Sequence, residues 1–191
     1  MARVSYPKPD ELTPANQELM AQLPPLNVFR MMSGTGASFA PFMSFISAYL
    51  NDGILDQELR ELVILRVGHL VGSAYEVHQH ERVARTLGIS EERIQAVKVG
   101  SVSALFTTAE NAALAFAEEQ VANVKVSDAT FAATQDHLSD PEIVELTLVA
   151  NTYVMVCRFL ETLEVDLEAQ DITGSGLEEI ERSVKTLAGT T

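Results

Sequence analysis

Cysteine and basic residues are scarce in this chain of 191 residues. There is one cysteine, Cys157, so the chain has no internal disulfide and no dithiol pair. A single cysteine suits a reducing compartment, and we expect a cytoplasmic protein. Lysine and arginine together number 13, against 27 aspartate and glutamate residues, which gives a formal charge of −14. So acidic a chain repels nucleic acid and anionic membrane surfaces, and we expect it to bind neither.

Long apolar runs are missing as well. No uninterrupted apolar run approaches the roughly 20 residues that a membrane-spanning helix needs. The N-terminal stretch contains Pro7, Pro9 and Pro14 and lacks the apolar core of a signal peptide. With 47% hydrophobic residues, the composition predicts a soluble globular protein. Its length suits one compact domain with an extended arm.

The residues that are present favour helices throughout. Apolar residues recur at spacings of three and four, and Gly and Pro lie mainly between these segments. The last predicted helix is apolar nearly all round, so we expect it to be central and buried. The predicted fold class is all-α, a helical bundle of six to eight helices. Helices are predicted over residues 37–50, 57–70, 74–87, 90–98, 107–122, 128–137 and 139–166.

Three parts are expected along the chain: an N-terminal arm over residues 1–25, a single helical domain over 26–168, and a C-terminal tail over 169–191. The tail contains a glycine-rich hinge at residues 174–176. A short amphipathic helix with one apolar stripe is not stable alone, so we expect it to dock on its own core or on a neighbouring subunit. The stripe consists of Leu177, Ile180, Val184 and Leu187.

Titratable residues concentrate between Glu61 and His80, a segment that holds three of the four histidines. On one continuous helix, six residues of this segment would share a face. If Gly72 breaks the helix, two helices could still direct both halves of the motif at one point. The six residues are Glu61, Leu65, His69, Ser73, Glu76 and His80.

Three short matches between residues 55 and 94 carry a family resemblance: LRELVILRV at 59–67, GSAYE at 72–76 and LGIS at 87–90. With His80, they resemble the carboxymuconolactone decarboxylase and alkylhydroperoxidase D-like family. The likeness extends over about residues 26–165. Members of that family are all-helical and assemble as trimers or hexamers, so the resemblance implies an alkylhydroperoxidase D-like bundle and a homo-oligomer.

The same resemblance exposes a difference at the centre of the motif. The peroxidase branch of the family has a glutamate, a Cys-x-x-Cys pair and a histidine, and the matching positions here hold Glu61, Ser73, Glu76 and His80. Peroxide reduction at such a site needs a thiolate and a second thiol that resolves it. Cys157 is expected far away on another helix. We therefore predict no dithiol peroxidase activity, although the family label alone would suggest a peroxiredoxin-type antioxidant enzyme.

The residues that remain suit proton transfer without a cofactor. The decarboxylase branch of the family implies a lyase that acts on a small carboxylated lactone. The same groups would serve an isomerase that acts on an enolisable ketone. His80 is predicted to be the general acid or base, Glu76 to orient it or exchange a proton with it, and Glu61 to support the relay.

Four further residues are predicted to bind the substrate. A serine or tyrosine hydroxyl donates a hydrogen bond, and a planar guanidinium matches the shape of a carboxylate. The predicted substrate-binding residues are Ser73, Tyr75, Arg66 and Arg158.

Each of these residues also has a purely structural explanation. Ser73 and Glu76 fit the S-x-x-E pattern of a capping box. Glu76 and His80 fit an ordinary i,i+4 surface pair. Glu61 could pair with an arginine, and Arg158 within an apolar helix is expected to find a structural partner. The alternative from a different class is therefore a catalytically silent binding or scaffold protein, unless Glu61, Glu76 and His80 converge in one pocket.

The other histidines and a metal site are weaker hypotheses. His69 and His137 lie near helix ends, where a cationic imidazole is favoured, and His78 is expected to point away from His80. A metal site built from Glu76, His80 and His69 has no supporting His-Glu-x-x-His signature. We predict neither a metal ion nor a cofactor.

Overall fold

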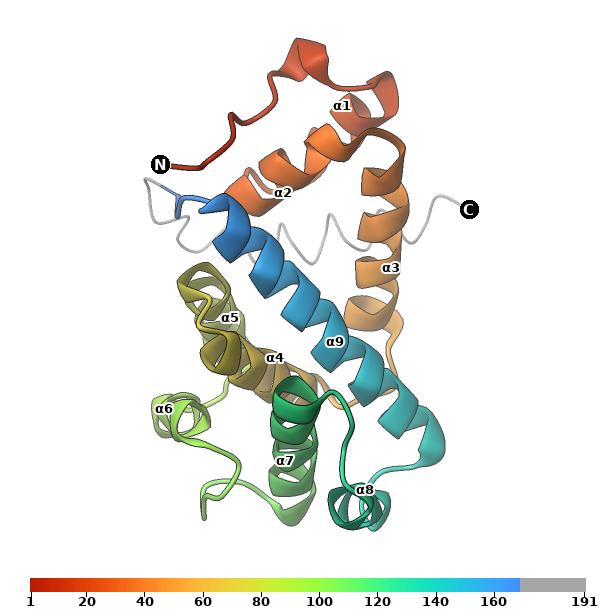
Figure 1. The fold of residues 1–191 in the computed structure, drawn as a ribbon, viewed down its shortest axis with the longest axis vertical. Helices are drawn as coiled ribbons and strands as arrows, with labels where there is room; N and C mark the ends of the chain where they lie inside the picture. Colours follow the sequence, from red (N-terminus) through yellow and green to blue (C-terminus); the bar gives the residue numbers. More distant parts are fainter. Residues whose placement is uncertain (169–191) are drawn as a thin grey trace. The chain divides into compact units, whose positions relative to one another are not determined.

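The computed structural model describes residues 1–168, and all regular secondary structure in that range is helical (Figure 1). This confirms the predicted all-α fold class. Among the described residues, 1–53 with 162–168 form one compact unit, and 54–161 form another. The predicted tail, with its hinge and amphipathic stripe over 169–191, lies outside the described residues.

The first unit contains the helices α1 (Pro14–Met20), α2 (Asn27–Met32) and α3 (Phe39–Asp52), with two 3-10 turns, η1 (Pro9–Glu11) and η2 (Ser33–Ser38). Asn16 of α1 is buried, and its side-chain amide donates to the carbonyls of Ser33 and Gly36 at 2.9 Å. Gly36 has φ of 63°, a left-handed conformation that glycine adopts easily. The sequence does not predict α2, because six residues show too little periodicity.

The second unit is built from six helices, the last of which ends in the first unit. They are α4 (Gln57–Val71), α5 (Ala74–Thr86), α6 (Glu91–Val99), α7 (Thr108–Asn123), α8 (Asp128–Gln135) and α9 (Asp140–Leu163). The first five begin after a polar residue whose side chain accepts a hydrogen bond from a backbone N–H three residues later. These caps explain why the predicted starts agree closely with the observed ones.

α4 is the central helix of this unit. It packs against α5, α6 and α7, and Leu62, Val63 and Ile64 are fully buried. The prediction that the last helix is apolar and buried nearly all round is wrong in part, since Val144 and Leu148 of α9 are about half exposed. The sequence does not reveal that α4 is central, because this helix carries several polar residues. In the structure these residues are paired with other groups inside the protein.

α9 has one buried and one exposed face. By length and composition alone it is the one helix of residues 1–168 that would suit a membrane span, with a mean hydropathy of 1.5 over its most apolar stretch. Half of that stretch is buried inside the protein. The core helix of a globular protein has the same properties, so they are weak evidence for a membrane segment.

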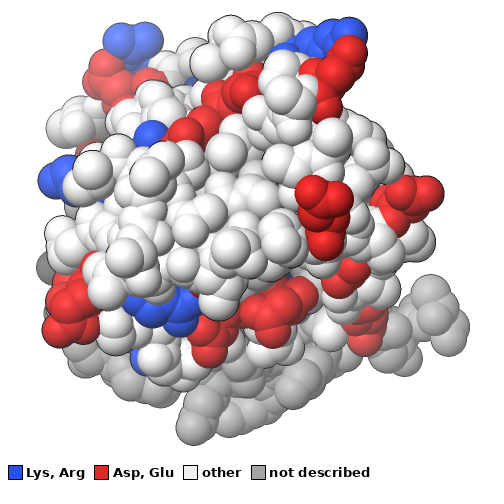
Figure 2. All heavy atoms as spheres, turned by 90° about the horizontal axis from the view of Figure 1, so that it is seen from below, with Lys and Arg blue, Asp and Glu red and all other residues white. Residues whose placement is uncertain are grey.

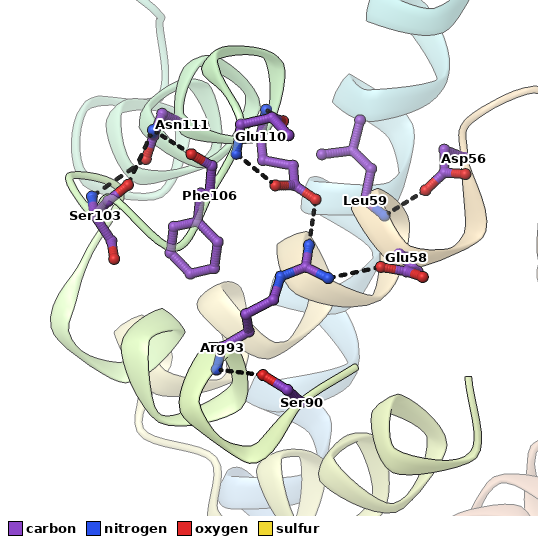
Figure 3. A network of polar contacts seen from close by, with 10 residues as sticks. Asp56, Glu58, Leu59, Ser90, Arg93, Ser103, Phe106, Glu110 and Asn111 are labelled. Atoms are coloured by element: carbon purple, nitrogen blue, oxygen red, sulfur yellow. Dashed lines mark hydrogen bonds and ion pairs between the residues drawn. The ribbon is translucent and has the colours of Figure 1, made fainter. Parts of the chain in front are cut away.

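An ion-pair network joins α4, α6 and α7 (Figure 3). Arg93 of α6 donates to Glu58 of α4 at 2.7 Å and also to Glu110 of α7. Glu110 in turn accepts from the backbone N–H of Thr107 and so completes a capping box at the start of α7. We call Arg93, Glu58 and Glu110 the Arg93 cluster; their side chains are 22, 43 and 12% exposed.

The excess of acidic residues is visible at the surface. Figure 2 views the molecule from the side on which α6, α7 and α8 lie in Figure 1, and acidic side chains border a broad uncharged area there. The acidic groups on this face are therefore spread around its rim.

Candidate functional site

Two helices, α4 and α5, carry the candidate site, and a tight turn joins them. Gly72 ends α4 with φ of 80°, the left-handed conformation that is common at helix C-termini. The N–H groups of Gly72 and Ser73 both donate to the carbonyl of Gly68, at 2.9 and 3.0 Å. α5 begins directly after this turn. Of the two arrangements considered from the sequence, the structure therefore has two helices that lie against each other.

Gly68 allows α5 to approach α4 closely. A Cβ atom at this position would lie 3.1 Å from Cγ2 of Val77 and 3.8 Å from Cβ of Glu76. The first distance is shorter than an ordinary van der Waals contact, so a larger residue would push against α5. This close approach helps to bring His80 of α5 within reach of Glu61 of α4.

Each nitrogen of the His80 ring contacts a buried carboxylate. Nδ1 lies 2.5 Å from Oε1 of Glu61 on α4, and Nε2 lies 3.0 Å from Oε1 of Glu76, one turn earlier on α5. The side chains of His80, Glu61 and Glu76 are 13, 2 and 7% exposed. We call these three residues the His80 cluster. The structure thus brings together the three residues that the sequence singles out as candidate catalytic groups.

With both carboxylates ionised, the geometry of the cluster is that of a positively charged His80. Ionised carboxylate oxygens only accept hydrogen bonds, so both ring nitrogens must donate, and an imidazole with two N–H groups is a cation. Burial by itself lowers the pKa of His80, but the charges and hydrogen bonds of Glu61 and Glu76 outweigh it and raise the pKa to about 10. Two carboxylates and one imidazolium leave the cluster with a net charge of −1.

Two residues of α9 lie beside the cluster, and sequence reasoning missed both. The ring of Tyr153 meets the His80 ring edge-on, with centroids 5.0 Å apart and planes at 89°. Cys157, one turn later, is hydrogen-bonded to Ser73, and burial together with the charge of Glu76 raises the pKa of its thiol to about 12. The expectation that Cys157 lies far from the motif is therefore wrong. The available signal was the spacing of four, which places Tyr153 and Cys157 on one face of a helix.

Ser73 and Glu76 form half of the predicted capping box. The Ser73 hydroxyl accepts a long hydrogen bond of 3.5 Å from the N–H of Glu76, so Ser73 is the N-cap of α5. The Glu76 carboxylate contacts His80, and the N–H of Ser73 donates to Gly68. Ser73 and Tyr75 are both buried. Their roles in substrate binding remain predictions.

The two arginines proposed to bind a carboxylate lie apart from the His80 cluster. Arg66 donates through Nε to Glu118 at 2.8 Å and through Nη1 to two carbonyls at the end of α6, at 3.2 and 3.0 Å. These contacts satisfy the C-terminal end of α6 and join it to α7. Arg158 is exposed on α9. Glu61, for which a pairing with an arginine was considered, contacts His80.

The remaining histidines do not join the cluster. His69 is partly exposed near the end of α4, and burial lowers its pKa. His78 and His137 are exposed. Within residues 1–168, no three histidine, cysteine, aspartate or glutamate side chains are arranged to hold a metal ion. The hypothesis of a metal bound by Glu76, His80 and His69 therefore finds no support there.

Comparison with known proteins finds a family match over part of the chain. Residues 37–119 match the profile of the carboxymuconolactone decarboxylase family, a region that includes the whole His80 cluster. The uncharacterized protein YdfG of Bacillus subtilis (strain 168) is 25% identical over 111 residues, which cover 57% of this chain and 76% of that protein. The predicted family resemblance is thereby confirmed.

Solved structures share the fold. An alkylhydroperoxidase AhpD core, an uncharacterized peroxidase-related protein from Ralstonia eutropha JMP134, matches with a TM-score of 0.76 at 19% identity over 96% of both chains. A variant of the debrominase Bmp8, in complex with 2,3,4-tribromopyrrole, matches with a TM-score of 0.67 at 14% identity over 98% of this chain and 100% of that one. At these identities the likeness shows the fold alone, and it confirms the alkylhydroperoxidase D-like bundle.

Proposed function

We propose that this member of the carboxymuconolactone decarboxylase family is a small-molecule enzyme that transfers protons without a cofactor, as a lyase or an isomerase. Its substrate is a small carboxylated lactone or an enolisable ketone. The observation that carries the proposal is the buried His80 imidazolium, held between Glu61 and Glu76 at 2.5 and 3.0 Å. Buried ion pairs add little stability for their cost, and strongly shifted pKa values concentrate at functional sites.

Glu76 is the group best placed to accept a proton. Its contact with His80 engages one carboxylate oxygen, Oε1, so the second oxygen can act as a general base. Glu76 removes a proton from the carbon beside a carbonyl, and the electron pair of the broken C–H bond forms an enolate. Protonated Glu76 then accepts more weakly from His80, and the Nε2–H of His80 can donate to an enolate oxygen placed beside it and stabilise its charge. Glu61 keeps the Nδ1–H and holds the ring in place.

The destination of the proton decides the reaction. If Glu76 returns it to a different carbon, the double bond shifts and the reaction is an isomerisation. If a carboxylated lactone loses carbon dioxide, the electron pair of the broken C–C bond enters the conjugated carbonyl, and a proton from the His80 cluster goes to the carbon that lost the carboxylate. Both reactions use the same three side chains.

A dithiol peroxidase reaction does not fit this chain. Cys157 is its one cysteine, and the thiol is buried. Because its pKa is raised to about 12, the thiol stays protonated at neutral pH, and no second thiol can resolve an oxidised sulfur. We therefore do not propose for this protein the peroxidase activity that the name of the peroxidase-related structure suggests.

A catalytically silent binding or scaffold protein is the second candidate function. The role of Ser73 as a helix cap favours it, since that role explains the serine without chemistry. The convergence of Glu61, Glu76 and His80 favours the enzyme, because a silent protein has no need for the three groups to meet in a buried position.

Hydrogen exchange at carbon tests the proposed function. The full chain is incubated in D2O with a panel of enolisable ketones and carboxylated lactones, and deuterium uptake and loss of carboxylate are followed by NMR. We expect wild-type protein to accelerate one of these reactions, and His80→Gln and Glu76→Gln to lose the acceleration while still melting cooperatively. Acceleration that survives both substitutions would contradict the proposed roles, and no acceleration over the whole panel would favour the silent protein.

A further inference from the structure

We infer that the site takes an electrically neutral carbonyl compound rather than a carboxylate, so that its reaction is an isomerisation rather than a decarboxylation. This inference rests on the proposed function and narrows it. It is carried by the charge of the His80 cluster, by the positions of the arginines in residues 54–161, and by the uncharged side chains that α9 places beside His80.

The His80 cluster already holds more negative than positive charge. The one imidazolium contacts two carboxylates, Glu61 at 2.5 Å and Glu76 at 3.0 Å, and can neutralise the charge of only one of them. One carboxylate charge therefore remains unbalanced. All three side chains are largely buried, so water and salt screen that charge only weakly. A substrate carboxylate would add a second unbalanced negative charge at the same place.

A neutral substrate keeps this charge constant through the reaction. When Glu76 takes the proton it becomes neutral, and the negative charge moves to the enolate oxygen, beside the Nε2–H of His80. The site therefore carries the same net charge before and after proton transfer. With a carboxylated substrate, the site would hold twice that charge at every stage, in surroundings of low polarity.

The arginines of α4 do not offset the added charge. Arg66 is engaged by Glu118 and by the end of α6. Since successive residues of an α-helix are separated by about 100°, Arg60 lies about 100° and Arg66 about 140° around α4 from Glu61. Both side chains therefore start from sides of α4 other than the one that carries Glu61.

α9 presents an uncharged surface to the cluster. The ring of Tyr153 lies perpendicular to that of His80, and Cys157 is a protonated thiol bonded to Ser73. Arg158 follows Cys157 directly, which turns it about 100° around the helix from that face, and it is exposed. Neither side chain brings a positive charge to the site, so they do not offset a substrate carboxylate.

The test compares one molecule in two charge states. A β,γ-unsaturated cyclohexenone that bears a carboxylic acid and the methyl ester of the same compound are each incubated with wild-type full-length protein in D2O. Deuterium uptake beside the ketone and movement of the double bond into conjugation are followed by NMR, relative to buffer alone. We expect kcat/KM for the ester to exceed that for the acid at least about tenfold, which corresponds to about 1.4 kcal/mol.

A charge variant tests the cause of the preference through binding, which does not require turnover. Glu76→Gln removes the unbalanced charge, so we expect the acid to bind more tightly relative to the ester than it does in wild type. Glu92→Gln makes the same change in total charge at an exposed position of α6, and the preference should stay as in wild type. Calorimetric titration with both compounds measures these ratios.

The outcomes separate this inference from the proposed function. If wild-type protein turns over the acid as fast as the ester, and Glu76→Gln abolishes both rates, the proposed function stands and the neutral-substrate inference is overturned. If neither compound reacts faster than in buffer but the ester binds and the acid does not, the charge inference stands and the chemistry is wrong. If Glu92→Gln changes the preference as much as Glu76→Gln does, the net charge of the chain is responsible and the inference fails.

Discussion

Two clusters that involve α4 contain the same set of charges, one cation between two carboxylates, and yet differ in what they can do. Arg93 binds Glu58 and Glu110 where α4, α6 and α7 meet (Figure 3). His80 binds two carboxylates in the same way, at 2.5 and 3.0 Å. The side chains of the Arg93 cluster are 22, 43 and 12% exposed, whereas those of the His80 cluster are 13, 2 and 7% exposed.

The two clusters differ in whether the cation can release its proton and in how well the cluster is shielded from water. An arginine keeps its proton in proteins, so the Arg93 cluster can only hold helices together. A histidine can release and regain a proton, and burial strengthens every interaction around it. A cation between two carboxylates therefore becomes a candidate for chemistry when it is titratable and shielded from solvent, and a structural clamp when it is neither.

The largest expected effect separates the clusters by activity. Glu76→Gln removes the proposed base and should lower the proton-transfer rate by about 10²- to 10⁴-fold. Glu58→Gln makes the same chemical change in the Arg93 cluster and should leave the rate within about twofold of wild type, since that cluster has no chemical role. Deuterium uptake into a reactive ketone measures both rates. Equal losses in the two variants would remove the distinction between the clusters.

The next effect separates them by stability. His80→Ala leaves two buried carboxylates without their cation and should lower the free energy of unfolding by about 3–5 kcal/mol. Arg93→Ala removes a partly solvated cation, whose ion pairs are screened, and should cost about 1 kcal/mol. Urea unfolding of both variants gives the two values. A larger cost for Arg93→Ala would mean that solvent exposure does not distinguish the clusters.

A third effect appears as a function of pH. Because the pKa of His80 is raised from 6.5 to about 10 in the folded state, its contribution to stability is complete below pH 6.5 and is lost as the pH rises towards 10. The loss should reach at most about 1.4 kcal/mol per pH unit over that window. The urea midpoint of wild type should therefore fall more steeply with pH than that of His80→Gln. Parallel pH profiles would contradict the raised pKa.

The smallest effect concerns the neighbour on α9. Tyr153→Leu removes the edge-on ring contact with His80 and should destabilise the fold by about 0.5–1.5 kcal/mol beyond the change in buried area. Tyr153→Phe keeps the ring and serves as the matched control, which should retain the contact. Thermal unfolding with the catalytic rate distinguishes a packing role from a role of the hydroxyl. A rate loss in Tyr153→Phe as large as that in Tyr153→Leu would show that the hydroxyl, and not the ring contact, is what matters.

The sequence predicts much of the fold because each helix boundary is set by residues that are close to it in the sequence. Asp56, Ser73 and Ser90 each cap a helix within their own first turn, and Gly72 ends α4 where a left-handed residue is needed. The family resemblance supplies the register of Glu61, Glu76 and His80. The two helices meet at these residues because the chain turns at Gly72. The sequence alone did not decide between such a turn and one continuous helix.

Contacts between distant segments could not be read in the same way. The partner of Arg66 is Glu118, 52 residues later, and no local pattern links this arginine to its partner. Tyr153 and Cys157 reach the site because α9 passes beside His80 and Ser73. Their spacing of four places them on one face of a helix, but it does not say which other residues that face meets.

The protonation state of the His80 ring is the most direct measure of whether this cluster is a charged proton-transfer site. Nitrogen-15 NMR of protein labelled at histidine, assigned with His80→Gln, reports both ring nitrogens separately. The structure predicts that both carry a proton at neutral pH and that the signals remain those of an imidazolium until the pH approaches about 10. A neutral ring with one bare nitrogen at pH 7, titrating near the ordinary value of 6.5, would contradict the charged cluster and the function proposed for it.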